Sequence, residues 1–182
     1  MNIVSSAQSL LFDFHNSVTT QPIRGKTSKT KWCPPPQGFV KINFDAATFR
    51  DREGIGAGGI ARDDRGNCLA WRTGFFGGLR EAELGKAVEL ELKFGWERCV
   101  VEGDCLQVIR KLNSHECDFS STGPIIADVH INICEFRTIS FMHVNRLANS
   151  TAHMIARQAF DNAGRIIPPA FLYEAITADN PF

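Results

Sequence analysis

From residue 40 onward, segments with a strand pattern alternate with segments with a helix pattern, and their order restricts the fold. A strand-like stretch at 40–46 precedes a hairpin pattern, in which strands at 54–62 and 68–75 flank a turn rich in Asp and Gly at 63–67. Next come a helix, a strand, two helices, a strand and a final helix. This order predicts an α/β layer with a mixed sheet, antiparallel at the hairpin and parallel where helices cross over.

The later elements are predicted from apolar periodicity and from glycines that end helices. Helices are expected at 79–97, 105–115, 123–136 and 149–164, and strands at 98–104 and 138–146. The glycines of the strand at 54–62 lack the following helix and the Lys-Ser/Thr pair of a phosphate-binding loop. Small residues in a strand more often let another backbone approach closely, so we expect close packing there.

Three regions are expected along the chain. Residues 1–31 combine an expected amphipathic helix with a basic linker, residues 32–164 form a globular domain, and residues 165–182 form a C-terminal tail. The linker is either a solvated tether or a flexible arm that contacts phosphates. Its basic residues are Arg24, Lys26, Lys29 and Lys31.

The composition argues against several classes of protein. Lysine and arginine (20) balance aspartate and glutamate (20), so nucleic-acid binding would require a local basic patch. The six cysteines include no C-x-x-C pair, which argues against a zinc site or a dense disulfide framework. The N-terminus lacks the basic region of a secretory signal, and no apolar run reaches the length of a membrane span. We therefore expect an intracellular protein, nuclear or cytoplasmic, that does not bind a membrane.

Two aspartates lie where strand patterns end. Asp45 ends the apolar run of the first strand, and Asp104 ends the strand at 98–104 directly ahead of a helix. If these strands are parallel neighbours, the two carboxylates lie side by side at the edge where α/β sheets usually hold ligands. A divalent cation would then relieve their repulsion, and oxygen ligands favour Mg²⁺ or Mn²⁺. Alternatively, Asp45 is only a polar strand end, and Asp104 is the N-cap of the next helix.

The chain resembles a known family in four segments. It is similar to the ribonuclease H-like domain of the plant retroelement-type, or reverse transcriptase-like, group in "PPPQGFVKINFDAA", "GIGAGGIARDDRGN", "ERCVVEGDCLQVIRKLNS" and "FMHVNRLANSTAHMIARQA". The resemblance runs from about Trp32 to Gly164, and it continues more weakly through "IIPPAFLYEAITAD". It implies an α/β, RNase H-like fold, a five-stranded mixed sheet flanked by helices. It also implies a monomer whose partner is an RNA–DNA hybrid or other nucleic acid.

The resemblance further implies an activity and a catalytic site. Members of this group cleave the RNA strand of RNA–DNA hybrids endonucleolytically, using acidic residues that hold two Mg²⁺ or Mn²⁺ ions. Asp45 matches the first aspartate of the family, and Asp104 matches the aspartate after the fourth strand. His153 matches the last position of the pattern Arg-x-x-Asn-x-x-Ala-Asp/His, where a neutral imidazole can bind metal or carry a proton. Without this match, His153 would be interpreted as an ordinary helix residue.

The glutamate of the family has two possible matches. Glu83, in "EAEL", is the nearest local match, and the resemblance then makes it a catalytic residue and a metal ligand. A second alignment places Lys86 at this position and shortens the helix by about six residues, which changes the side chain that faces the site. Glu89 points away from the helix face that carries Glu83, and Glu91 lies among apolar residues.

Three functions are consistent with these residues. The first is an active Mg²⁺-dependent hybrid ribonuclease, which the intact Asp45 and Asp104 favour. The second is a domesticated domain that binds nucleic acid without cutting it, and the third is a retroelement-derived structural remnant. A shortened helix favours the second and third functions.

Overall fold

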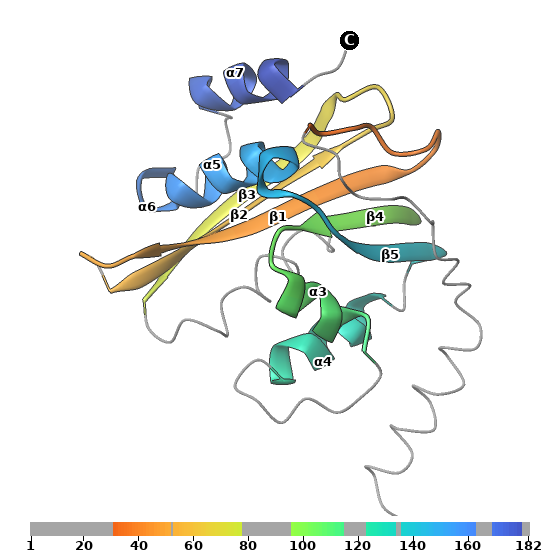
Figure 1. The fold of residues 1–182 in the computed structure, drawn as a ribbon, viewed down its shortest axis with the longest axis horizontal. Coiled ribbons are helices and arrows are strands. Elements are labelled where there is room, and N and C mark those ends of the chain that lie inside the picture. The colour runs from red at the N-terminus through yellow and green to blue at the C-terminus, as the bar shows by residue number, and fades with distance from the viewer. Residues whose placement is uncertain are drawn as a thin grey trace, which may run out of the picture.

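A computed structural model describes residues 31–51, 53–77, 96–114, 123–133, 136–162 and 169–179. Over these residues, five strands form one mixed sheet, with helices on both faces (Figure 1). The strands are β1 (Val40–Phe49), β2 (Gly54–Arg62), β3 (Cys68–Gly77), β4 (Arg98–Gly103) and β5 (Thr138–His143). The helices are α3 (Leu106–Leu112), α4 (Gly123–Asn132), the 3-10 helix η2 (Arg146–Asn149), α5 (Ser150–Arg157), α6 (Ala159–Asn162) and α7 (Ala170–Asp179).

The sheet has the strand order β3-β2-β1-β4-β5. The hairpin strands β2 and β3 pair with each other antiparallel, and β2 pairs with β1 antiparallel. The other two pairs, β1 with β4 and β4 with β5, are parallel. These pairings confirm the predicted hairpin and the predicted mixed sheet. They also show that β1 and β4 are parallel neighbours, the condition under which the two aspartates lie side by side.

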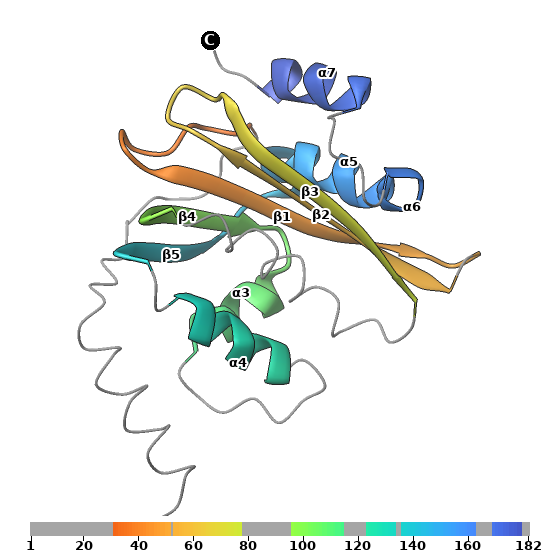
Figure 2. The ribbon, with the colours of Figure 1, turned by 180° about the vertical axis from the view of Figure 1, so that it is seen from behind.

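The helices form a layer on each face of the sheet. α3 and α4 lie on one face, whereas α5, α6 and α7 lie on the other (Figures 1 and 2). The final predicted helix is interrupted, because Gln158 leaves the helical conformation (φ −103°, ψ 12°) between α5 and α6. α7 forms within the segment for which the sequence predicts only a tail. The helix predicted at 79–97 falls almost entirely outside the described residues.

Alternating side chains of β1 enter the two layers. Ile42 and Phe44 are buried in the larger apolar cluster, together with residues of α3 and α4 such as Ile109 and Val129. The side chains that alternate with them are polar, and two of these, Asn43 and Asp45, contact Asn149 and His153 at and within α5. These buried polar residues of β1 are Lys41, Asn43 and Asp45. This face of β1 is therefore polar, although it lies inside the protein.

The described helices and cysteines bear on the expectations about membrane spans and disulfides. None of the described helices is both long enough and apolar enough to cross a membrane. The four cysteines within the described ranges are free thiols: Cys33, Cys68, Cys99 and Cys105.

Candidate active site

Asp45 and Asp104 each directly follow the last residue by which the neighbouring parallel strands β1 and β4 pair. The pairing of β1 with β4 ends at Phe44 and Gly103, so the next residue along each segment is an aspartate. Asp45 is 7% exposed, because β1 continues along β2 and α5 covers this face. The negative charge of Asp104 acts on the Asp45 carboxyl. The structure thus brings these two predicted site residues together.

His153 lies directly against Asp45. The Nδ1 atom of His153 is 2.6 Å from Oδ2 of Asp45, although the two residues are 108 positions apart in the chain. His153 belongs to α5, which packs on the polar face of β1. The structure therefore places His153 in the same site as the two aspartates, and it does not support the interpretation of His153 as an ordinary helix residue.

Two glycines of β2 let α5 approach the sheet closely enough for this contact. Gly58 pairs with Asp45 across the β1–β2 ladder, and a Cβ atom at Gly58 would lie 2.3 Å from the backbone nitrogen of Ala156. A Cβ atom at Gly56 would lie 2.2 Å from the carbonyl oxygen of Ala156. Any larger residue would push the helix away, since backbone atoms cannot rotate aside. The predicted role of these glycines in close packing is confirmed.

Arg146 is a site residue that we did not predict. Its Nη1 atom lies 3.4 Å from Oδ2 of Asp104, and its Nη2 atom lies 2.9 and 3.0 Å from the two ring nitrogens of His153. We assign the proton on the His153 ring to Nδ1, which faces Asp45, so that Nε2 is the acceptor for Arg146. The arginine of the Arg-x-x-Asn-x-x-Ala-His pattern was the signal that could have identified Arg146.

The alternative role of Asp104 as a helix N-cap is wrong. The N-cap residue of α3 is Cys105, and no side chain caps this helix. The Asp104 carboxylate contacts Arg146 instead, and its backbone carbonyl oxygen lies 3.2 Å from Nε2 of His143. Asp104 therefore faces the site rather than its own helix.

Asn43 and Asn149 fasten the start of α5 to β1. The side-chain amide of Asn149 donates to the carbonyl oxygen of Phe44 (2.9 Å), and its oxygen accepts from Nδ2 of Asn43 (3.2 Å). Asn43 also donates to Glu102 and accepts from Trp32 and Arg62. Asn149 comes one helical turn before His153, so this buried network orients the helix that carries the imidazole.

The environment of Asp45 raises the pKa of its carboxyl. Burial raises the pKa of the Asp45 carboxyl above its ordinary value, and the charge of Asp104 raises it further. Hydrogen bonds from His153 and from the backbone of Ala46 lower the pKa, but they offset these two causes only in part. Because a bound cation would remove the repulsion between the two carboxylates, this raised pKa is typical of a site that receives positive charge.

Asp45→Asn is expected to stabilise the metal-free protein at neutral pH. Because the pKa of Asp45 is raised in the folded state, ionising it costs stability as the pH rises from the unfolded-state value through the folded-state value. Asparagine does not ionise, so the variant should have the higher melting temperature at pH 7 in a chelating buffer. Below the ordinary carboxyl pKa of 3.8, where Asp45 is protonated in both states, the difference should vanish. A lower melting temperature for Asp45→Asn at pH 7 would contradict this prediction.

The donor atoms fit a hard divalent cation. Asp45 and Asp104 offer two carboxylates on neighbouring strands, and proteins usually hold Mg²⁺ through one or two carboxylates. Within the described ranges, no group of three or more His, Cys, Asp or Glu side chains is arranged to hold a metal ion. A further carboxylate would come from the predicted helix. Its candidates, Glu83, Glu89 and Glu91, and the alternative Lys86, lie outside the described residues.

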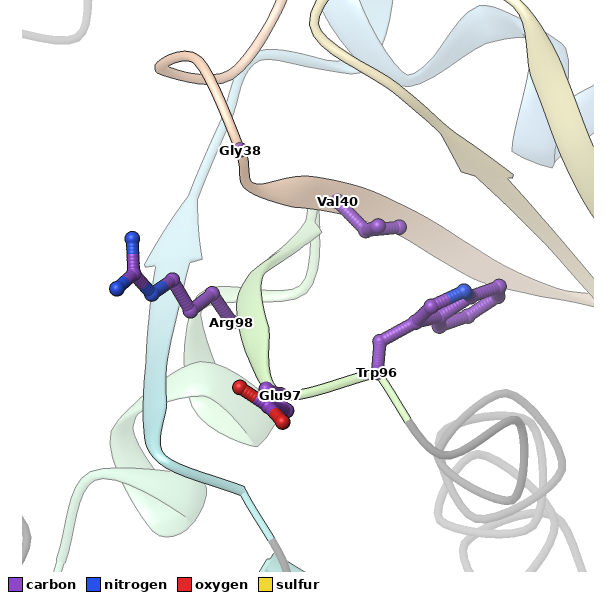
Figure 3. Close-up of a pocket in the computed structure, with 5 residues that line it drawn as sticks. All are labelled: Gly38, Val40, Trp96, Glu97 and Arg98. Carbon is purple, nitrogen blue, oxygen red and sulfur yellow. The ribbon is translucent and has the colours of Figure 1, made fainter.

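A separate hollow lies at the opposite end of the β1–β4 pair. It is lined by Gly38, Val40, Trp96, Glu97 and Arg98 (Figure 3). Val40 begins β1, whereas Asp45 follows the last residue of β1 that pairs with β4. This hollow is therefore not part of the carboxylate site.

Comparisons with solved structures identify the fold. The N-terminal RNase H domain of Rv2228c from Mycobacterium tuberculosis is 19% identical, with a TM-score of 0.61, over 68% of this chain and 94% of that one. RNase H1 from Halobacterium salinarum is 22% identical, with a TM-score of 0.55, over 69% and 99%. LC11-RNase H1 in complex with RNA/DNA hybrid is 19% identical, with a TM-score of 0.57, over 68% and 97%. No curated protein sequence matches the chain.

A family model described as "Reverse transcriptase-like" matches residues 43–159. The match includes Asp45, Asp104, Arg146 and His153, and it ends before α7. Because it spans more than half of the 182 residues, and because solved RNase H domains share the five-stranded sheet, this chain belongs to the reverse transcriptase-like family and has the RNase H-like fold.

Proposed function

We propose that this protein is a ribonuclease of the RNase H type, which cleaves the RNA strand of RNA–DNA hybrids with Mg²⁺ or Mn²⁺. The observation that carries the proposal is the meeting of Asp45, Asp104 and His153 at one end of a parallel strand pair. The solved structures with this fold are ribonuclease H domains, and LC11-RNase H1 was solved with a hybrid bound. Together, these findings support a nucleic-acid substrate and an acidic active site.

The residues of the site have distinct roles in this proposal. Asp45 and Asp104 would hold the metal, which when bound activates water and stabilises charge on phosphate oxygens. His153 donates from Nδ1 to Asp45 and keeps the lone pair on Nε2, the atom that can take up a proton. Arg146, whose side chain is 61% exposed, offers a guanidinium that can bind a substrate phosphate. Contacts of this kind recognise the backbone and the 2′-hydroxyls rather than the base sequence.

A second function, nucleic-acid binding without cleavage, is favoured by the contact between Arg146 and Asp104. This contact gives Asp104 a positive partner within the chain, so that part of the charge that a metal would supply is already present. If Lys86 occupies the glutamate position, a second positive charge would compete with the metal. The domain would then bind a hybrid as a monomer and leave it intact.

Cleavage of a labelled RNA–DNA hybrid, with and without Mg²⁺, distinguishes the two functions. For the active enzyme, Glu83→Gln should lower the rate by about 100-fold or more, because a misplaced or missing ligand costs this much even when the fold is retained. Glu89→Gln, which removes the same charge from the other side of the predicted helix, should leave the rate unchanged. The metal-ligand role of Glu83 would be wrong if both variants cleaved like wild type.

Absence of cleavage by the wild-type protein would contradict the enzyme hypothesis. If this inactive protein still bound the hybrid in a gel-shift assay, the second function would hold. Lys86→Glu should then increase Mg²⁺ binding, measured by calorimetry, if Lys86 occupies the ligand position.

The basic linker is expected to contribute to binding through phosphate contacts. Replacing its arginine and three lysines by glutamine should reduce the slope of log K against log salt by about one unit for each lost contact. Fluorescence anisotropy with a labelled hybrid, measured across a range of salt concentrations, gives this slope. The residues replaced are Arg24, Lys26, Lys29 and Lys31. An unchanged slope would show that the linker is a passive tether.

A further inference from the structure

The C-terminal helix α7 packs against α5 and also contacts strand β2 of the sheet. Leu172 of α7 is fully buried in an apolar cluster with Ala152 and Ile155 of α5 and Ile60 of β2. Both ribbon views show α7 next to α5, on the same face of the sheet (Figures 1 and 2). The family match ends at residue 159, so α7 lies outside the matched residues, and it packs against α5, the helix that carries His153.

The last residue of α7, Asp179, binds the first turn of α5. Its Oδ1 atom accepts from the hydroxyl of Ser150 at 2.9 Å, and its Oδ2 atom accepts from the hydroxyl of Thr151. The Asp179 side chain is only 10% exposed. These two hydroxyl groups come from the first two residues of α5, less than one turn before His153.

Asp179 also binds a buried guanidinium on the sheet. Nη1 of Arg62 lies 3.2 Å from Oδ2 of Asp179, and Arg62 is 1% exposed beneath the ring of Trp32. Nη2 of Arg62 donates to Oδ1 of Asn43, which belongs to the polar network at the start of α5. In the part of the chain that the structure describes, Asp179 is thus a single carboxylate that joins β2, α5 and α7.

We propose that Asp179 is a positioning residue for the active site, and that α7 holds His153 against Asp45 by clamping the first turn of α5 to the sheet. This proposal deepens the proposed function and rests on it for its catalytic consequence. Asp179 does not touch the reacting groups. Its effect passes through Ser150, Thr151 and Arg62 to the orientation of the imidazole. The segment beyond the family match therefore contributes to the site and is not only a tail.

The test compares Asp179→Asn with Glu174→Gln. Both substitutions replace a carboxylate of α7 by an amide, but Glu174 is exposed. In metal-free protein, ¹⁵N–¹H correlation spectra of the His153 ring report the hydrogen bond from Nδ1 to Asp45. We expect Asp179→Asn to shift the Nδ1 signal toward that of a free imidazole and to lower kcat on a hybrid by about 10- to 100-fold, with KM little changed. Glu174→Gln should retain the wild-type spectrum and rate.

Wild-type His153 signals in folded Asp179→Asn would overturn the proposal and leave α7 a purely stabilising role. If the signal shifts while the wild-type protein cleaves no hybrid, the positioning role stands and only the proposed function fails. If Asp179→Asn does not fold, Thr151→Val provides the same test with the Arg62–Asp179 pair intact. Thr151→Ser keeps the hydroxyl, so this variant should retain the wild-type signal of His153. A shifted signal in Thr151→Ser would also overturn the proposal.

Discussion

Replacing Asp45 by asparagine should abolish hybrid cleavage, with a loss of more than about two orders of magnitude in kcat/KM. Altering residues that only support metal ligands already costs about 10- to 100-fold, and Asp45 is a proposed ligand itself. The fold should persist, since the amide has nearly the same volume and can still accept the bond from His153. Asp104→Asn should have a similar effect on the rate. Calorimetry should show weaker Mg²⁺ binding for each variant, because each removes one of the two carboxylates.

Asp128→Asn is the matched control for these two variants. Asp128 is an exposed aspartate of α4, on the other face of the sheet from His153. Its substitution changes the net charge by the same amount and should leave both metal binding and cleavage at the wild-type level. Equal Mg²⁺ affinity in the wild type and in Asp45→Asn would mean that the metal site lies elsewhere.

Gly58→Ala should cause the second large effect, although it adds a single methyl group. The new Cβ atom would lie 2.3 Å from the backbone nitrogen and 2.9 Å from the Cα atom of Ala156. Relief of this clash requires α5 to move, so we expect a loss of about 1–3 kcal/mol in the free energy of unfolding. Because the same movement separates His153 from Asp45, cleavage should fall by about 100-fold in protein that remains folded. Urea unfolding and the hybrid assay measure the two effects.

Gly77→Ala is the control for Gly58→Ala, since a Cβ atom at Gly77 meets no described atom within 4 Å. Both positions lie in strands of the antiparallel part of the sheet, and both exchanges add the same methyl group. Gly77→Ala should therefore leave stability and cleavage close to the wild type. Wild-type activity in Gly58→Ala would show that the site tolerates a displaced α5.

Much of the fold and the two aspartates could be predicted from the sequence. The hairpin was evident from a turn rich in Asp and Gly between two strand patterns, and the crossover helices implied parallel strands. The sequence placed the two aspartates at one edge of the sheet only if β1 and β4 were parallel neighbours, and the structure shows that they are. Local periodicity predicts where each strand ends, because the end of a strand is a property of a short segment.

The partners of these aspartates were decided by tertiary structure. A helix pattern identifies the apolar face of α5, but it does not indicate that the helix lies close enough for His153 to reach Asp45. That approach depends on glycines of a different element, β2. Without the family resemblance, His153 had no signal of its own, and Arg146 became a site residue only through its contacts with Asp104 and His153.

The contacts of the C-terminal segment with β2 and α5 were also decided by the tertiary structure. The bond between Arg62 and Asp179 joins residues 117 positions apart, and nothing near either residue in the sequence indicates the other. In the sequence, nothing distinguishes Asp179 from a solvated charge in a tail. In the structure, α7 buries Leu172 against α5, and this packing brings Asp179 to Arg62. The pairing of Arg62 with Asp179 then follows from burial, because a guanidinium removed from water requires an anion nearby. The sequence by itself determined the strands and the positions of the two aspartates, whereas packing between distant elements determined which side chains surround them.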